Sequence, residues 1–185
     1  MINFISAILN IFVKNKSMKA QVSIIMGSTS DLPVMEKAAK ILDEFEIPFE
    51  INALSAHRTP EKVGNFAKNA KDNGIKVIIA GAGMAAHLPG VIAAMTPLPI
   101  IGVPIKASLE GVDALYSIVQ MPPGIPVATV GINGAMNAGL LAVQILANGD
   151  AALMQKFITY KENLKRKIVK ANEELKGVSF KFKTN

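Results

Sequence analysis

The sequence predicts an α/β fold, a three-layer sandwich around a doubly wound, parallel sheet of five strands. Two observations carry this prediction. Short apolar runs alternate with helical segments from Gln21 onward, and the first of these runs is apolar at nearly every position. Strands buried on both faces of a parallel sheet have this composition. A chain of 185 residues has room for one such domain and little for a second.

The first two strands flank an amphipathic helix. Val22–Met26 (VSIIM) is the apolar run expected of a central strand, and Phe49–Leu54 is the second strand. Between them, residues 31–46 repeat apolar side chains at helical spacing. The stripe comprises Val34, Ala38, Ile41 and Phe45.

The middle of the chain continues the alternation. Pro60–Lys71 is expected to be a helix, because a proline after Thr59 is favoured in a first helical turn. Lys76–Ala80 (KVIIA) is the third strand, a short helix follows within residues 87–95, and Ile100–Val103 is the fourth strand.

The last part predicts a short helix, a fifth strand and two longer helices. These span, in order, Val112–Val119, Val127–Ile132, Asn133–Asn148 and Ala151–Leu175. The flavodoxin-like strand order 2-1-3-4-5 is favoured over a full Rossmann fold, because the chain is too short for six strands in two mononucleotide-binding halves.

The helix at residues 134–146 has an unusual composition. A stripe of small residues combines with apolar bulk on the rest of the helix, so several of its sides should be buried. The stripe comprises Ala135, Ala138, Gly139 and Ala142. From the sequence alone, neighbouring subunits or the core of the same chain could cover it. The low charged content, 18%, also favours self-association.

The net charge of +6 does not indicate nucleic-acid binding. Residues 18–160 hold ten Lys or Arg against eleven Asp or Glu, whereas residues 161–185 hold eight against three. A basic terminal helix without interleaved aromatic side chains is typical of a solvated face. The absence of cysteine excludes disulfides and thiolate metal sites, and it fits a reducing compartment.

The first seventeen residues differ from the rest. Residues 1–13 (MINFISAILNIFV) are too few to span a bilayer as a helix, and they lack the basic start of a signal peptide. We expect residues 1–17 to be a non-essential extension, with an interfacial anchor as the alternative. Residues 18–176 are expected to form a single catalytic domain, and residues 177–185 a basic tail.

Ligands of open α/β sheets bind beyond the carboxyl ends of the strands, so the loops after the first three strands are the candidate site. The first loop, residues 27–31 (GSTSD), combines glycine, hydroxyls and a helix start, which together favour a phosphate. Asp31 would then accept hydrogen bonds from sugar hydroxyls. In the alternative interpretation, Ser30 or Asp31 is only a helix N-cap.

The second loop, residues 55–60 (SAHRTP), contains a planar phosphate-binding group, Arg58, and a candidate acid–base group, His57. The third loop, residues 80–90 (AGAGMAAHLPG), lets a planar ring approach the backbone. His87 is either a second acid–base group or holds this loop in shape. The loop also fits the loose G-x-G-x-x-A fingerprint, but its place after the third strand argues against a dinucleotide site.

These loops indicate a phosphorylated small molecule and histidine acid–base catalysis, with no metal and no cofactor. The loops at residues 27–31, 55–60 and 81–90 resemble the signature loops of bacterial-type, class I 5-(carboxyamino)imidazole ribonucleotide mutases, the phosphoribosylaminoimidazole carboxylase catalytic-subunit family. Residues 111–122 (GVDALYSIVQMP) and 124–127 also match. The resemblance covers roughly residues 21–148.

The resemblance implies transfer of a carboxylate from nitrogen to carbon in purine (IMP) biosynthesis, by a cytoplasmic homo-octamer that binds neither nucleic acid nor membrane. It implies His57 as the proton carrier. It also implies a substrate-binding set of Ser28, Ser30, Asp31, Ser55, Ala56, Arg58, Ala82, Gly83 and Leu88. In this set Ser28, Ser30 and Arg58 would hold the phosphate, and Ala82, Gly83 and Leu88 would border the imidazole.

Two positions depart from the pattern. Met84 stands where the family often has glycine, and Pro123 where a basic residue is common. Two alternatives remain open. One is a 5-aminoimidazole ribonucleotide carboxylase that uses free carbon dioxide. The other is a non-catalytic flavodoxin-like nucleotide- or flavin-binding module, for which Tyr116 is the sole loop aromatic to stack on a flavin.

Overall fold

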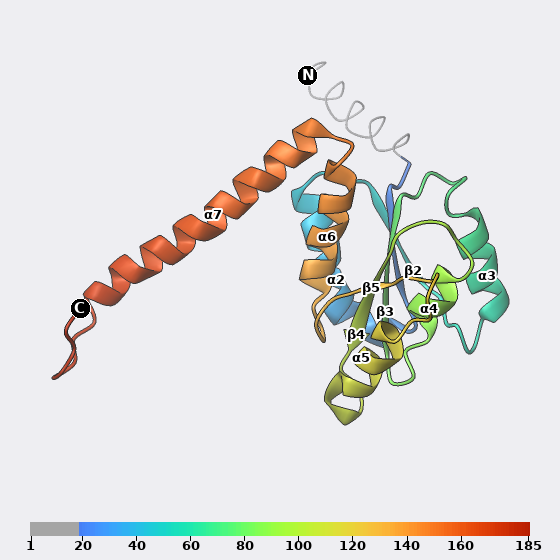
Figure 1. Cartoon of the computed structure of the whole chain (residues 1–185), viewed down its shortest axis with the longest axis horizontal. Helices are drawn as coiled ribbons and strands as arrows, with labels where there is room; N and C mark the ends of the chain where they lie inside the picture. Colours follow the sequence, from blue (N-terminus) through green and yellow to red (C-terminus); the bar gives the residue numbers. More distant parts are fainter. Residues whose placement is uncertain (1–18) are drawn as a thin grey trace, which may run out of the picture.

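Five strands form one parallel sheet in the order β2-β1-β3-β4-β5, as the sequence predicts. The structure is a computed structural model that describes residues 19–185, so the expected extension at 1–17 lies outside the described residues. The strands are β1 (Val22–Met26), β2 (Phe49–Ala53), β3 (Val77–Gly83), β4 (Ile100–Ile105) and β5 (Ala128–Thr129). β1 and β3 are apolar and buried because strands lie on both sides of each, and helices cover both faces (Figure 1).

Two strand ends differ from expectation. β3 continues three residues past Ala80, because its pairing with β4 runs on to Gly83, which lies opposite Ile105. Glycine at position 81 is needed because a neighbouring side chain leaves no room for a Cβ. A Cβ on Gly81 would lie 2.4 Å from Met35 Sδ. β5 is shorter than expected. The Pro104 carbonyl of β4 accepts a hydrogen bond from the Asn133 N–H, but proline has no N–H to donate in return, so the pairing of the two strands does not continue there.

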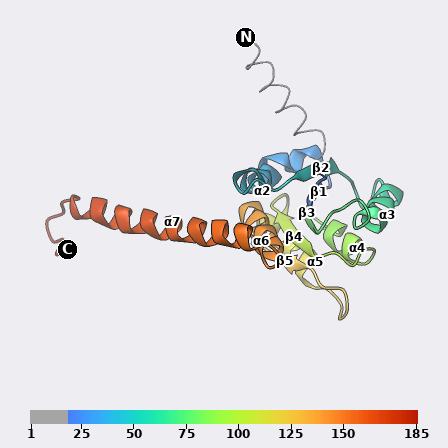
Figure 2. The ribbon, with the colours of Figure 1, turned by 90° about the horizontal axis from the view of Figure 1, so that it is seen from above.

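The helices lie on both faces of the sheet (Figure 2). They are α2 (Leu32–Glu44), α3 (Pro60–Asn69), α4 (Leu88–Ala93), α5 (Val112–Val119), α6 (Ala135–Ala147) and α7 (Ala151–Lys176), with 3-10 turns η1 (Thr29–Asp31) and η2 (Leu109–Gly111). One core lies between the sheet and α2, α6 and the start of α7. A second core lies between the sheet and α3, α4 and α5.

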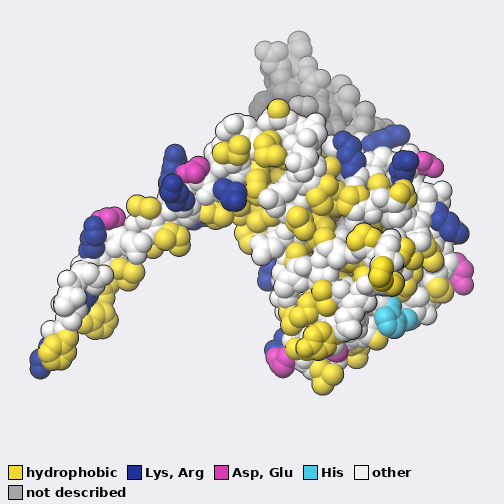
Figure 3. Space-filling view, viewed as in Figure 1, with side chains coloured by type: hydrophobic (Ala, Val, Ile, Leu, Met, Phe, Trp, Pro, Cys, Tyr) yellow, Lys and Arg dark blue, Asp and Glu magenta, His cyan; other side chains and the backbone are white. Residues whose placement is uncertain are grey.

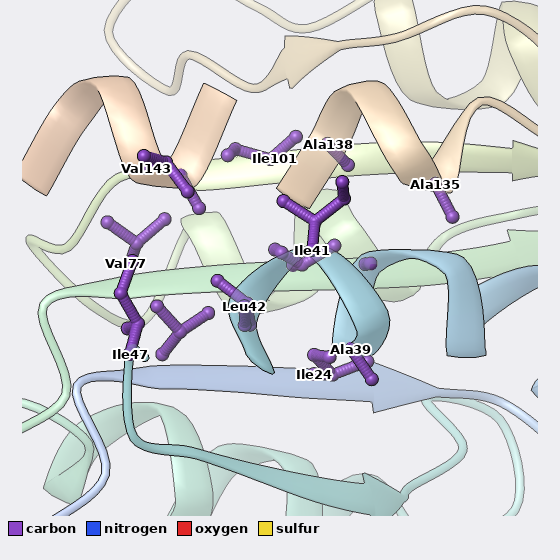
Figure 4. Close-up of a cluster of buried hydrophobic side chains, with 14 of the residues drawn as sticks. Ile24, Ala39, Ile41, Leu42, Ile47, Val77, Ile101, Ala135, Ala138 and Val143 are labelled. Carbon is purple, nitrogen blue, oxygen red and sulfur yellow. The ribbon is translucent and has the colours of Figure 1, made fainter. Parts of the chain in front are cut away.

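The small-residue stripe of α6 packs on α2 within the same chain. Ala135, Ala138 and Val143 point into the core that Ile24 and Ile41 share (Figure 4). A Cβ on Gly139 would lie only 3.0 Å from the carbonyl oxygen of Ala38, so glycine permits this close helix approach. Of the two interpretations left open by the sequence, burial in the chain's own core is the one that the structure supports for this stripe.

α7 begins on the body and then projects away from it (Figures 1 and 2). Asp150 caps it by accepting a hydrogen bond from the Leu153 N–H at 3.0 Å. Leu153 and Phe157 are buried, and the ring of Tyr160 lies 5.5 Å from that of Phe45. In the part of the chain that the structure describes, no helix is both long and apolar enough to cross a membrane.

Candidate active site

One pocket of ~520 Å³ lies beyond the carboxyl ends of β1, β2, β3 and β4. The structure brings all eleven predicted residues together around it: Ser28, Ser30, Asp31, Ser55, Ala56, His57, Arg58, Ala82, Gly83, His87 and Leu88. Their roles toward a ligand stay predictions. Four further residues line the pocket, namely Gly27, Met84, Ala85 and Ala107.

The first loop is held by the side chain of Ser28. Ser28 Oγ accepts hydrogen bonds from the Ser30 N–H at 3.3 Å and from the Ser30 hydroxyl at 2.9 Å, and so caps η1. Asp31 stands at the N-cap position of α2, but its side chain makes no capping hydrogen bond. Neither the Ser30 nor the Asp31 side chain caps α2, and both residues line the pocket, so side-chain capping of this helix does not explain them.

Asp31 is a half-buried carboxyl group beside the predicted phosphate loop. Burial raises the pKa of the Asp31 carboxyl above its usual value of 3.8, since a charged carboxylate loses solvation there. Hydrogen bonds with the Ser28 main chain and the Ser30 side chain, and the positive charge of Arg58, act in the opposite direction without overcoming burial. A ligand that offers hydroxyl donors would compensate the carboxylate for the lost solvation.

Arg58 joins the second loop to the first. Its Nη2 donates to the carbonyl oxygen of Gly27 at 2.9 Å, and its Nε donates to Ser55 Oγ at 3.3 Å. Thr59 fixes the base of the second loop, because its hydroxyl oxygen accepts from the Ser55 N–H at 3.0 Å. The guanidinium is thus held beside the Gly27–Ser28 turn, where a phosphate would meet both the loop and a fixed positive charge.

The second and third loops meet through the two histidines. His57 Nε2 lies 2.8 Å from His87 Nδ1, and the ring planes make an angle of 76°. Both side chains are exposed to the pocket, and the histidine surface is visible in Figure 3. A hydrogen bond between two imidazoles requires one nitrogen to donate and the other to accept, so the pair can hold a proton between the loops.

The wall formed by β3 and β4 is apolar. Ala82 and Gly83 end β3, Met84 follows the strand, and Leu88 begins α4 with its side chain in the core. Met84 has φ +57°, a left-handed conformation that glycine adopts readily and methionine rarely. The position where the resemblance leads one to expect glycine is therefore one that favours glycine.

Ala107 is a lining residue that sequence reasoning missed. It follows β4, whereas only the loops after the first three strands were considered. An alanine has no chemistry to draw attention to it. The signal lay in the sheet order, because β4 lies beside β3 and a Cβ on Gly83 would approach Ala107 Cβ to 3.2 Å.

The pocket therefore has two ends. The polar end lies beyond the carboxyl ends of β1 and β2 and consists of serine hydroxyls, Asp31 and Arg58. The other end lies beyond the carboxyl ends of β3 and β4 and consists of small apolar groups. The two histidines lie where the loops after β2 and β3 meet. This arrangement suits an anionic ligand whose other end undergoes proton transfer against an apolar wall. Among residues 19–185, no three His, Asp or Glu side chains gather as metal ligands would.

The chain is similar to known proteins along most of its length. A model of the AIR carboxylase family matches residues 21–167. The chain is 56% identical to the N5-carboxyaminoimidazole ribonucleotide mutase of Thermotoga maritima over 87% of this chain and 95% of that protein. It is 60% identical to the Pyrococcus abyssi protein of the same name, over 79% and 84%.

The chain is also similar to part of a longer protein and to a solved structure. The chain is 52% identical to the phosphoribosylaminoimidazole carboxylase of Schizosaccharomyces pombe, over 91% of this chain but only 31% of that protein. The crystal structure of PurE from Treponema denticola superposes with a TM-score of 0.77 at 34% identity, covering 84% of this chain and 98% of the other.

Proposed function

The chain belongs to the AIR carboxylase family, and from that premise we propose that it is an N5-carboxyaminoimidazole ribonucleotide mutase. It converts 5-(carboxyamino)imidazole ribonucleotide into 4-carboxy-5-aminoimidazole ribonucleotide in purine biosynthesis, which makes it an isomerase. Relatives with the mutase name are matched over most of their length and most of this chain. The observation that carries the mechanism is the His57–His87 pair between an anion-binding end and an apolar end.

The polar end would hold the nucleotide. Ser28, Ser30 and Arg58 surround the turn where the phosphate would lie, and Asp31 would accept hydrogen bonds from the ribose hydroxyls. Ser55 and Ala56 border the same region from the second loop. The phosphate and the ribose do not react, but when they are held in place the imidazole ring is oriented as well. Contacts far from the reacting atoms therefore position the ring.

The reaction would proceed in two halves at the apolar end, with Ala82, Gly83 and Leu88 beside the imidazole ring. The bond between the exocyclic nitrogen and the carboxylate carbon breaks, carbon dioxide leaves, and His57 gives its proton to that nitrogen. Ring carbon 4 then attacks carbon dioxide, and His57 removes the proton from carbon 4. One proton is given and one regained, so the histidine ends as it began.

A carboxylase that uses free carbon dioxide is the nearest rival. The chain spans only about a third of the fungal proteins that bear the carboxylase name, whereas it spans 95% of the Thermotoga maritima mutase. These lengths favour the mutase. A flavin-binding module is less well supported, since none of the residues lining the pocket is Phe, Tyr or Trp, and Tyr116, exposed on α5, does not reach it.

The proposal includes a homo-oligomer, with the octamer implied by the family resemblance. The apolar stripe of α7 that packs on the body continues past Tyr160 as Leu164, Ile168, Ala171 and Leu175. Ile168 and Leu175 are 65% and 56% exposed, so the distal stripe lies on the part of α7 that extends from the body (Figure 3). A second copy of the chain would bury this face. A cytoplasmic location completes the proposal, because a phosphorylated substrate does not cross membranes unaided.

The test is turnover by the purified full-length protein without added metal or bicarbonate. We expect 5-(carboxyamino)imidazole ribonucleotide to be converted to the carbon-4 carboxylate. In a parallel reaction, 5-aminoimidazole ribonucleotide with carbon dioxide should react far more slowly at matched concentrations. The reverse ranking would make the protein a carboxylase, and no conversion of either substrate would refute both activities.

A further inference from the structure

Met84 lies at the apolar end of the pocket, and the residue is 61% exposed. We propose that this side chain closes over the reacting ring and retains carbon dioxide between the two half-reactions. The inference rests on the proposed mutase function. It adds a residue that determines how often the carbon dioxide released in the first half-reaction is used in the second.

The apolar end otherwise lacks a group that can move over a ligand. Ala82, Ala85 and Ala107 carry only a methyl group, and Leu88, 3% exposed, is fixed in the core. Among the described residues that form this wall, Met84 is the one with a long side chain outside the core. Methionine is unbranched, with three rotatable bonds, so it can adapt to the shape of a bound ring.

The chemistry gives such a side chain a task. Once the N–C bond breaks, carbon dioxide is uncharged and is no longer covalently attached to the nucleotide or the protein. Charged groups at the polar end cannot hold an apolar molecule strongly, whereas an apolar cover excludes water and blocks its escape. Escape leaves 5-aminoimidazole ribonucleotide and carbon dioxide in place of the carbon-4 carboxylate.

The backbone keeps the side chain at the pocket despite a steric cost. Met84 has φ +57°, in the region that residues other than glycine rarely adopt. A tight turn follows, in which the Ala86 N–H donates to the Met84 carbonyl at 2.8 Å and the His87 N–H donates to the Ala85 carbonyl at 2.7 Å. Met84 is thereby fixed three residues before His87. Strained residues of this kind cluster at functional sites.

The experiment follows a labelled carboxylate through a single turnover. Wild-type protein is mixed with substrate carrying ¹⁴C in the N-carboxylate, in a large excess of unlabelled carbon dioxide, and the label kept in the carbon-4 carboxylate is measured. Met84→Ala and Met84→Leu form the matched pair, since both retain a Cβ at the same strained φ and differ in bulk. Met136→Ala, an exposed methionine on α6 outside the pocket, is the control.

We expect wild-type, Met84→Leu and Met136→Ala to keep most of the label, and Met84→Ala to lose it several-fold more often. Equal retention in Met84→Ala and wild-type would overturn the role of Met84. Complete exchange of the label for unlabelled carbon dioxide in the wild-type protein would also overturn the role of Met84, although turnover would still support the mutase. No wild-type turnover would instead refute the proposed function itself.

Discussion

His57 Nε2 and His87 Nδ1 lie 2.8 Å apart and join the loops that follow β2 and β3. Only one proton fits between two nitrogens at this distance. When His57 carries the proton on Nε2, His87 must accept with Nδ1, and the reverse tautomer leaves Nε2 of His57 as the acceptor. The contact therefore fixes the direction of the His57 ring and couples the tautomer of each histidine to that of the other.

Replacing His57 should abolish turnover but leave binding nearly intact. General acid–base catalysis contributes about 10²–10⁴-fold, and in the proposed mechanism both half-reactions use this histidine, so His57→Asn should lower kcat by at least about 10³-fold. Turnover and equilibrium binding of the product are the two measurements. An Asn variant that binds the product and retains wild-type turnover would remove His57 from the mechanism.

His87 should act by positioning His57. Asparagine places an amide oxygen close to where Nδ1 lies, so His87→Asn can still accept a hydrogen bond from His57, whereas His87→Ala cannot. We expect kcat to fall by up to about a hundredfold in His87→Ala, with KM little changed, and to recover in part in His87→Asn. A change in the pH profile of kcat in the alanine variant alone would accompany it. Equal loss in both variants would instead indicate a role that only imidazole fulfils.

A chain that starts at Met18 should keep full activity. The sheet begins at Val22, the family match begins at residue 21, and every residue lining the pocket lies in 27–107. Turnover and light scattering of the truncated and full-length proteins check this. Loss of turnover, solubility or assembly on truncation would show that the extension is needed.

The sheet order and the pocket were predictable for physical reasons. Strands apolar along their whole length, such as Val22–Met26, place themselves in the centre of a parallel sheet, and the carboxyl ends of neighbouring strands then converge. The packing of Gly139 on Ala38 was not predictable, since a small-residue stripe fits either a core or an interface. Nor was the conformation of Met84, because methionine at positive φ contradicts local preference and is enforced by the turn around it.

The distal stripe of α7 should control assembly. At about 100° per residue, Ile168 lies on the stripe with Leu164 and Leu175, and Arg166 lies on the opposite face. Ile168→Asp should reduce the size of the assembly measured by light scattering, whereas Arg166→Asp introduces a carboxylate on the same helix and should not. Because Ile168 is exposed within its own chain, the fold itself should lose no more than about 0.5 kcal/mol. Unchanged assembly in both variants would exclude this stripe as the interface.

Asp31 should reduce stability at neutral pH in return for binding. Burial raises the pKa of the Asp31 carboxyl in the folded state. The favourable contribution of this group to the free energy of unfolding is therefore present below the unfolded-state pKa of 3.8 and is lost as the pH rises through the folded-state pKa. Asp31→Asn removes the charge, so its thermal midpoint should exceed that of the wild-type at pH 7, and the gap should shrink as the pH falls toward 3.8. The same variant should bind the substrate more weakly, because the amide replaces the acceptor-only carboxylate that we propose to bind the ribose hydroxyls. Thermal unfolding at several pH values checks the effect on stability, and KM at pH 7 checks the effect on substrate binding. A variant less stable than the wild-type at pH 7 would contradict the assigned effect of burial.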